Sequence, residues 1–536
     1  MNPTIKIKFR EIFMNNKAGI FLAILGFFYM NVLVAGVPIF WEGHLFHEKL
    51  LSKEIMEWVK IALNPYKEDF YDSWGGMTGV WTWILFIVWK YNFDAWRYTK
   101  SIFFAISLLC VYLLVKTLLK SEKYALFSTI AYLFSFPLYI HVLVFDGPFI
   151  VAEAAKLVGL LMFLYDWKRD KTNIVHQIII FLCAWFAINT YTQSLSMIAV
   201  LCLSCIFLCA EKRKRYFILM LCLLTIHLGD IYDFGVVEET RPAMMSHTKM
   251  ITTMFVESIL KAVVQPVPVL ENLYYKTFWE VVTVYGIVFL AASIFIVLWK
   301  KKSWEIEEKR IIYFSLFWFL SEIPLWFVLP DPALRYTSSL FPPSFLLLFF
   351  LLKNAEEQMR RLGREKIWNI IVLVLLLCIV GTNSIYSVAF RATWGSAFIA
   401  EGNAMEFIEQ SRQPNSVILH YQPSTAPVFV PIDFSNTNAY RQKKDVIYLP
   451  ISNFSDEVLL EYTTQYNEVY VVERVTLSGK RFPPTYDLDK SQILSVINVI
   501  YGVQNTIFDK LFFSGRIVQW IKPNEVIVYR VKHHNL

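Results

Sequence analysis

Long apolar blocks alternate with short polar junctions over the first two-thirds of the chain. Most blocks are about 15 to 23 residues long, near the length that a helix needs to cross a hydrocarbon core of roughly 30 Å. They lie near residues 18–40, 95–115, 124–141, 148–166, 174–190, 192–209, 216–229, 278–299, 311–329, 338–352 and 367–386. The pattern predicts an α-helical polytopic membrane protein with about 11 TM helices.

The first block could be mistaken for a secretory signal, because it follows a cationic leader with Lys6, Lys8, Arg10 and Lys17. A signal core is shorter and ends at a cleavage site with small residues, and this block has neither property. Ten further apolar blocks follow it. We therefore interpret residues 18–40 as a retained first span.

Composition supports this class. The 536 residues are 56% hydrophobic and only 18% charged, which lies outside the usual range of soluble proteins. All seven cysteines fall inside apolar blocks, so no disulfide framework is expected. Cys202, Cys205 and Cys209 have helical spacing, but no histidine or carboxylate accompanies them in that block, and we interpret them as core residues.

Basic residues gather at every second junction. These junctions are the leader, Lys116 to Lys123, Lys168 to Lys171, Lys212 to Arg215, Lys300 to Lys302 and Arg360 to Lys366. Loops rich in Lys and Arg stay in the cytoplasm. We therefore expect a multi-pass protein of the cell membrane with a cytoplasmic N-terminus. The net charge of +7 marks these junctions and predicts no nucleic-acid partner.

Two outer segments, residues 41–94 and 230–277, are too long to be simple connectors. The stretch Met77 to Lys90 is apolar but too short to span comfortably, and counting it as a span would put the basic junction after Lys116 on the wrong side. Its tryptophans suit the headgroup layer: Trp81, Trp83 and Trp89. The stretch is predicted to be an interfacial helix.

From about Arg391 the composition becomes that of a soluble domain. Strands are predicted at 416–421, 445–449 and 468–472, helices at 401–411, 456–465 and 488–501, and a hairpin at 516–520 with 525–529. Because helices and strands alternate, a small α/β domain is expected. The predicted organisation is a transmembrane domain, residues 1–390, and an extracytoplasmic domain, residues 391–536.

Ionisable groups inside spans are costly, so each calls for a functional hypothesis. Here they gather near the outer ends of the spans: Glu42, Asp146, Glu153, Lys156, Asp230, Asp233, Glu280, Glu322, Asp331 and Arg335. The inner halves of the spans are nearly bare of them. This distribution predicts a site at the outer membrane surface, although capping carboxylates and an i,i+3 pair of Glu153 with Lys156 would explain part of it without function.

Four sequence features and their order carry a resemblance to a known family. A large outer loop opens with Glu42; FDAWRYTKSIFF, with Arg97, enters the second span; Asp146 lies in VLVFDGPFI. The segment PDPALRYTSSLFPP then contains Arg335 and Tyr336. Over roughly residues 18–390 the chain resembles the GT-C superfamily of glycosyltransferases, particularly the branch with protein O-mannosyltransferases and the lipid A aminoarabinose transferase.

The chain departs from that family in its first outer loop. The first acidic motif of the family is normally Asp, often Asp-Glu, whereas this chain has WEGHLFHE, and the family's His-Pro-Pro motif is absent. Glu42 matches the catalytic carboxylate by position. Three rivals remain in the same loop: Glu68, Asp69 and Asp72.

The resemblance implies an inverting transfer of a sugar from a polyprenyl-phosphate donor to a glycan, lipid or protein acceptor. Glu42 would be the general base, and Asp146 would orient the acceptor or a metal; a divalent metal ion is the one cofactor left open. The substrate-binding residues would be Arg335, Tyr336, Arg97 and Lys156. Arg335 suits the donor phosphate because a guanidinium holds phosphate oxygens bidentately.

Two other classes of function remain open at this point. One is a transporter or flippase of lipid-linked glycans, which would need polar groups near the midplane and broken helices there. The other is a membrane-anchored binding or assembly protein that acts through its α/β domain, for which a single anchor would suffice. Sugar transfer from a polyprenyl-phosphate sugar distinguishes the three.

Overall fold

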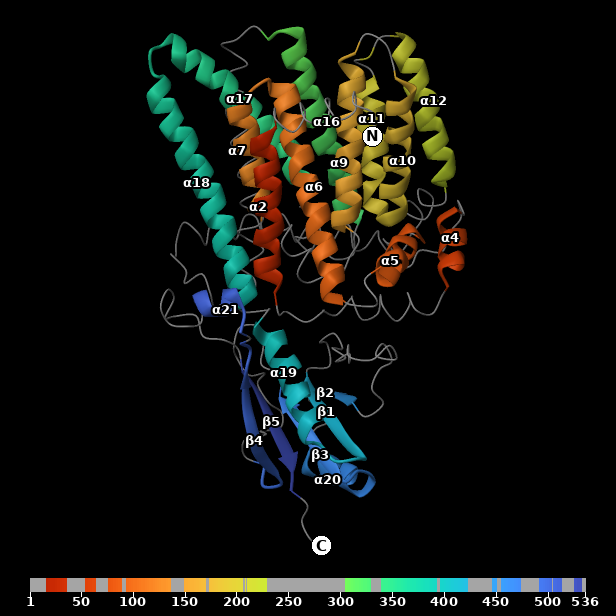
Figure 1. Ribbon diagram of the computed structural model, residues 1–536, viewed down its shortest axis with the longest axis vertical. Coiled ribbons are helices and arrows are strands. Elements are labelled where there is room, and N and C mark those ends of the chain that lie inside the picture. The colour runs from red at the N-terminus through yellow and green to blue at the C-terminus, as the bar shows by residue number, and fades with distance from the viewer. Residues whose placement is uncertain are drawn as a thin grey trace.

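The computed structural model describes residues 16–35, 54–63, 76–88, 93–135, 149–169, 173–205, 208, 210–228, 304–328, 339–392, 396–422, 446–450, 455–473, 491–503, 505–512 and 525–532. Figure 1 shows a bundle of long helices and, beyond one end of it, a smaller domain that contains the sheet.

Helices occur at each predicted span that the structure describes. They are α2 (Lys17–Val34), α6 (Phe93–Leu119), α7 (Glu122–Leu133), α9 (Phe149–Trp167), α10 (Ile174–Thr190), α11 (Ser196–Ser204), α12 (Ala210–Ile226), α16 (Ile306–Val328), α17 (Phe341–Arg361) and α18 (Glu365–Phe390). The predicted span 278–299 lies outside the described residues.

Two helical segments of the described chain are long and apolar enough to cross a membrane, Lys17–Val34 and Thr99–Leu119. The count of eleven spans therefore stays a prediction. Several helices nevertheless expose large apolar side chains on the bundle surface, among them Phe21, Phe28, Ile178, Phe217, Ile370 and Leu377. Exposed apolar surface of this kind is typical of contact with lipid.

Local sequence explains where several helices begin. Ser121 caps α7 and accepts a hydrogen bond from the amide of Tyr124 at 3.5 Å, and Asn173 caps α10 by accepting one from Val175 at 3.0 Å. Proline is placed in the first turn of α17, where an amide hydrogen would have no partner within the helix. The proline pair of the family-like motif thus opens a helix.

The predicted interfacial segment is helical, as α5 (Gly76–Val88), and it packs on the short helix α4 (Ile55–Leu63). The Trp58 ring fills the space beside Gly79, where an added Cβ would lie 2.1 Å from the ring. Thr78 donates a hydrogen bond to the carbonyl of Thr190 at 2.6 Å. Part of the segment 41–94, which is predicted to be an outer loop, therefore forms two packed helices, and α5 is hydrogen-bonded to the end of α10.

The C-terminal domain contains α19 (Ser396–Ser411), β1 (Ser416–Gln422), β2 (Val446–Pro450), α20 (Asp456–Gln465), β3 (Glu468–Glu473), β4 (Leu494–Tyr501), α21 (Ile507–Phe512) and β5 (Glu525–Val531). The strand order is β2-β1-β3-β5-β4. β1 runs parallel to β2 and β3, whereas β5 runs antiparallel to β3 and β4.

The sheet has one hydrophobic core on each face. Val417 and Leu419 pack with Leu459 of α20, while Ile418, between them in the sequence, packs with Ile408 of α19. This alternation follows from the pleat, since successive side chains of a strand point to opposite faces. α19 and α20 thus cover opposite faces of the sheet.

Two predictions for this domain were wrong. Residues 494–501, which lie inside the predicted helix 488–501, form β4, and the run of β-branched Val496, Ile497, Val499 and Ile500 is the local reason. The predicted hairpin of 516–520 with 525–529 is also wrong, because both edges of β5 are occupied, by β3 and by β4.

Candidate functional site at one end of the bundle

Most of the predicted site residues lie outside the described residues: Glu42, Asp146, Arg335 and Tyr336, together with Glu68, Asp69 and Asp72. Arg97 lies on α6, four residues from its start. Lys156 is described in full, on α9. The assignments of Glu42, Asp146 and Arg335 therefore stay predictions, and the described helices show only where the neighbouring chain is anchored.

The helix ends that flank these positions share one end of the bundle. α2 ends at Val34, eight residues before Glu42; α9 begins at Phe149, three residues after Asp146; and α17 begins at Phe341, six residues after Arg335. Figure 1 shows the end of α2 and the starts of α6 and α9 on the side of the bundle that faces the C-terminal domain.

Contacts between the helices agree with this placement. Ser101, near the start of α6, donates a hydrogen bond to Asn31, near the end of α2, at 3.2 Å. Phe149, at the start of α9, makes an edge contact with Tyr191, at the end of α10, with ring centroids 5.7 Å apart. Segments far apart in the sequence therefore meet here.

A buried ion triad lies just inside this end. The Lys156 ammonium is 2.7 Å from Glu153 Oε2 on the same helix and 2.9 Å from Glu322 Oε1 on α16. All three side chains are at most 3% exposed. Glu153 and Lys156 do pair, as their i,i+3 spacing allows, but they do not reach towards the surface. The third member, Glu322, comes from another helix.

Glu322 has two more hydrogen-bond donors. Its Oε1 accepts from Ser196 Oγ on α11 at 2.9 Å and from Trp318 Nε1, one turn back on α16, at 3.2 Å. Oε1 of Glu153, by contrast, is buried with no hydrogen-bond partner among the described residues. With all three groups ionised the triad carries one net negative charge, and its hydrogen bonds are concentrated on Glu322.

The depth of the triad follows from helix geometry. Lys156 is seven residues from the start of α9 and Glu322 is six residues from the end of α16. At 1.5 Å per residue, both lie about 10 Å inside the end of the bundle. The triad is thus below the flanking segments and within the helical part of the bundle.

This arrangement limits what Lys156 can do chemically. Two carboxylates already surround its ammonium, so a phosphate brought there would meet a net negative cluster. Burying an ion costs several kcal/mol unless close partners offset that cost, so the three groups are strongly held together. The geometry favours a positioning role, in which the triad fixes α9 against α16.

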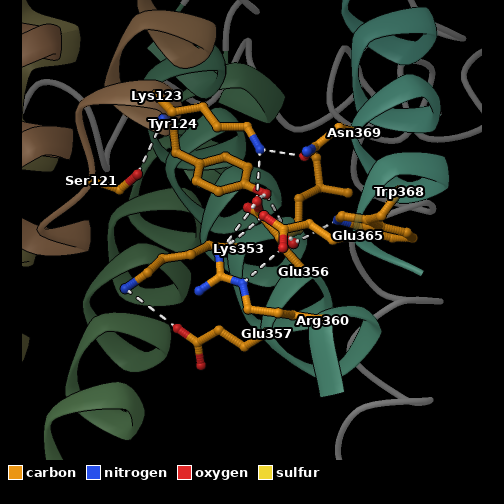
Figure 2. A network of polar contacts seen from close by, with 11 residues as sticks. Ser121, Lys123, Tyr124, Lys353, Glu356, Glu357, Arg360, Glu365, Trp368 and Asn369 are labelled. Atoms are coloured by element: carbon orange, nitrogen blue, oxygen red, sulfur yellow. Dashed lines mark hydrogen bonds and ion pairs between the residues drawn. The ribbon is translucent and has the colours of Figure 1, made fainter. Parts of the chain in front are cut away.

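A second polar network lies at the opposite end of the bundle. Figure 2 shows Glu356 of α17 between Lys123 and Tyr124 of α7. Lys123 Nζ is 2.9 Å from Glu356 Oε1, Tyr124 Oη is 2.5 Å from Oε2, and Lys123 also donates to Asn369 of α18 at 2.6 Å. Burial raises the pKa of Glu356, but hydrogen bonds from Lys123 and Tyr124 outweigh this effect and hold the pKa below its usual value.

This network joins α7, α17 and α18, and it includes basic residues from two of the junctions that the sequence assigned to the cytoplasm. Arg360 pairs with Glu365 across the turn between α17 and α18, with Nε 3.2 Å from Oε2. Lys123, Tyr124 and Arg360 each contact a neighbouring helix or turn (Figure 2). We interpret the network as a structural clamp.

The described residues contain no group of three or more His, Cys, Asp or Glu side chains that could hold a metal ion. Glu42 and Asp146 are not among those residues, so a divalent metal at the site stays a prediction. The six described cysteines are all free.

The sequence identifies Glu153, Lys156 and Glu322 as ionisable groups near the outer ends of the spans, but it does not predict that they are in contact. Nothing in it links Lys156 to Glu322, which is 166 positions away. The contact of Trp318 with Glu322 could have been predicted from the sequence, because their i,i+4 spacing places both residues on one helix face. The contact of Ser196 with Glu322 could not have been predicted, since a serine at the start of a helix most often acts as a cap.

No protein-family model and no curated protein matches this chain. Solved structures do. ArnT from Cupriavidus metallidurans, bound to undecaprenyl phosphate, matches with 11% identity and a TM-score of 0.45 over 96% of this chain and 97% of that one. AglB, the archaeal oligosaccharyltransferase from Archaeoglobus fulgidus in complex with an inhibitory peptide and a dolichol-phosphate, matches with 10% identity and a TM-score of 0.48 over 86% and 70%.

A further match is the Archaeoglobus fulgidus oligosaccharyltransferase in complex with Zn and sulfate, at 12% identity and a TM-score of 0.44 over 75% of this chain. The present chain spans only 60% of that one, and 62% of the apo form. All these matches share only 10–12% sequence identity with this chain. At TM-scores below 0.5 they do not establish a common activity.

Proposed function

We propose that this protein is an inverting glycosyltransferase that moves a sugar from a polyprenyl-phosphate donor to a glycan, lipid or protein acceptor at the outer face of the cell membrane. The observation that carries the proposal is the common location of the helix ends next to Glu42 and Asp146 and of the start of α6, the helix that contains Arg97 (Figure 1). This location supports a site at that end of the bundle, to which we assign Glu42, Asp146 and Arg335, themselves outside the described part of the chain.

The proposed reaction is a single displacement. The Glu42 carboxylate takes the proton of the acceptor hydroxyl while the oxygen attacks the anomeric carbon, forming the new glycosidic bond. The bond from that carbon to the phosphate oxygen breaks, its electron pair leaves with the polyprenyl phosphate, and the configuration inverts. Arg335, with Tyr336 and Arg97, binds the phosphate and offsets its developing charge. Asp146 orients the acceptor or a metal ion.

The triad supports this chemistry from beneath. By joining α9 to α16, Lys156 and Glu322 hold the start of one helix and the end of the other. Asp146 precedes the first helix by three residues, and Arg335 follows the second by seven. Productive geometry is sensitive to displacements of about 1 Å, so turnover requires that these two helix ends stay fixed relative to each other. In this proposal Lys156 acts as a positioning residue.

The orientation is part of the proposal. The basic junctions at Lys116 to Lys123 and Arg360 to Lys366 meet at the end opposite the C-terminal domain (Figure 1). With that end in the cytoplasm, the site and the domain of residues 391–536 face outwards, where the lipid-linked donor is used.

The test uses purified full-length protein in proteoliposomes with a panel of polyprenyl-phosphate sugars and candidate acceptors. The expected result is a glycosylated product together with free polyprenyl phosphate, and neither with Glu42→Gln. Movement of intact donor between leaflets without chemical change would instead indicate the flippase. Binding of the donor without sugar transfer and without movement between leaflets would indicate a binding or assembly protein.

A further inference from the structure

Arg391 lies where α18 ends and the C-terminal domain begins, and its side chain is fully buried. A buried guanidinium is costly unless its surroundings stabilise the charge, because it cannot deprotonate. The residues around it come from both parts of the molecule. Arg391 is therefore part of a contact between the bundle and the C-terminal domain.

Three interactions define the contact. Arg391 Nη2 donates a hydrogen bond to the carbonyl of Ala35, the residue that caps α2, at 3.0 Å. The guanidinium carbon lies 4.7 Å from the centre of the Phe508 ring, and Nη2 is 3.9 Å from Asp509 Oδ1. One side chain thus bridges the end of α2 and α21 of the C-terminal domain.

Electrostatics favour a cation at this point. The last carbonyls of a helix carry a partial negative charge, and Arg391 lies at the C-terminal ends of both α2 and α18. Asp509 adds a full negative charge with its side chain 2% exposed. The Phe508 ring offers its electron-rich face to the guanidinium. All three contributions would be weaker for a neutral residue.

α21 has a capped first turn and packs against the bundle. Thr506 and Asp509 cap its first turn: Thr506 Oγ1 donates to Asp509 Oδ2 at 2.5 Å and accepts from the Asp509 amide at 3.2 Å. Phe508 belongs to the hydrophobic core of the bundle, not to a core of the sheet. The C-terminal domain therefore reaches into the bundle through α21.

The chain before α21 is clamped as well. Ser396, at the start of α19, donates a hydrogen bond to the carbonyl of Gly502 at 2.9 Å. A Cβ at residue 502 would lie 1.8 Å from the carbonyl oxygen of Ser396, so only glycine allows this approach. The contact of Arg391 with α21 is thus supported from both sides.

We infer that Arg391 is a positioning residue that docks α21 on the outer end of α2, and so holds the start of the loop that carries Glu42. The expected effect on turnover rests on the proposed function, whereas the docking of α21 does not. Ala35 is seven residues before Glu42, so a displaced helix end changes where the loop begins. The C-terminal domain then contributes to turnover without touching the substrate.

The experiment combines amide hydrogen exchange with sugar transfer, on full-length protein in nanodiscs. Asp509→Asn is the most selective variant, because it removes the charge facing Arg391 while its amide oxygen can still cap α21. Arg391→Ala removes the whole contact between α2 and α21 that this side chain makes. Arg391→Lys keeps the positive charge but loses the planar, forked N–H donors of the guanidinium. The matched control is Arg215→Ala, which removes an exposed i,i+4 pair with Glu211 at 3.3 Å.

We expect Arg391→Ala and Asp509→Asn to speed exchange by at least about tenfold in residues 507–512, and also in residues 36–45, while β3 stays protected. Turnover should fall by about tenfold to a hundredfold, with donor KM within about twofold. Arg391→Lys should recover part of the turnover. Arg215→Ala should match the wild type in every measurement.

Unchanged exchange in residues 507–512 would overturn the docking. Faster exchange there with no change in residues 36–45, or with normal turnover, would overturn the positioning role. If the wild type transfers no sugar while both segments respond as expected, the docking and its effect on the loop stand, and the proposed glycosyl transfer is wrong.

Discussion

The Lys156 ammonium and the Glu322 carboxylate lie 2.9 Å apart in the interior of the bundle, although the two residues are separated by 166 positions in the sequence. Glu153 completes the group at 2.7 Å from the same ammonium. One cation therefore serves two buried carboxylates, and the three members of the triad should respond unequally to substitution.

Lys156→Met should be the most damaging change in the triad. It leaves two buried carboxylates with no cation, and an uncompensated buried charge typically costs about 3–5 kcal/mol. Glu322→Gln leaves the neutral pair of Glu153 with Lys156 and should cost clearly less. Unfolding of the purified variants in detergent measures this, with the exposed Lys214→Met as control. An equal loss for Lys156→Met and Lys214→Met would contradict the triad.

Ser196→Ala should destabilise the protein by about 1.5–3 kcal/mol, the range for a hydrogen bond to a charged group. Its hydroxyl donates to the Glu322 carboxylate at 2.9 Å. Ser315→Ala is the matched control, because that equally buried hydroxyl donates only to the carbonyl of Ile311, at 2.8 Å. The same unfolding measurement applies, and indistinguishable losses would show that Ser196 does not stabilise the carboxylate.

Glu356 should make the free energy of unfolding depend on pH in the acidic range. Burial raises its pKa, but the hydrogen bonds from Lys123 and Tyr124 outweigh this and lower it in the folded protein. A lowered folded pKa means that the stabilisation is present above the unfolded value of about 4.3 and is lost as pH falls through the folded pKa. The free energy of unfolding of wild type and Glu356→Gln should be measured between pH 3 and 7, and the difference between the two proteins should become smaller as the pH falls. A difference that does not change with pH would contradict the stabilising role of the Glu356 carboxylate.

The catalytic assignments predict two different failures. Glu42→Gln keeps the shape of the side chain, so donor binding should stay nearly intact while turnover falls by about a hundredfold to ten-thousandfold. Arg335→Lys keeps the charge but loses the fork, so both donor affinity and turnover should fall. Donor binding and single-turnover transfer distinguish these patterns. An active Glu42→Gln enzyme would move the base to Glu68, Asp69 or Asp72.

The orientation predicts which parts of the chain are accessible from outside. A tag after Leu536 should react with an impermeant reagent in intact cells, and a tag between Lys300 and Arg310 should react only after permeabilisation. Labelling with and without detergent measures both. A C-terminal tag that is protected in intact cells would exclude the proposed topology.

Much of the secondary structure could be predicted from local patterns. The helix α9 was expected at residues 148–166 and is found at Phe149–Trp167, and the strand β3 was expected at 468–472 and is found at Glu468–Glu473. β4 was missed, although its β-branched residues favour a strand. Its partner, β5, begins 24 residues after β4 ends, and pairing over that separation leaves no mark in either segment.

By itself, the sequence determined the class of protein, because hydropathy and the length of an apolar block are local properties that a lipid environment selects directly. It also placed ionisable groups near one end of the spans. Only the tertiary structure decided that Lys156 meets Glu322 and that Arg391 bridges α2 and α21. Such contacts depend on which helices become neighbours and in which rotation, and that choice is made by the packing of the whole bundle.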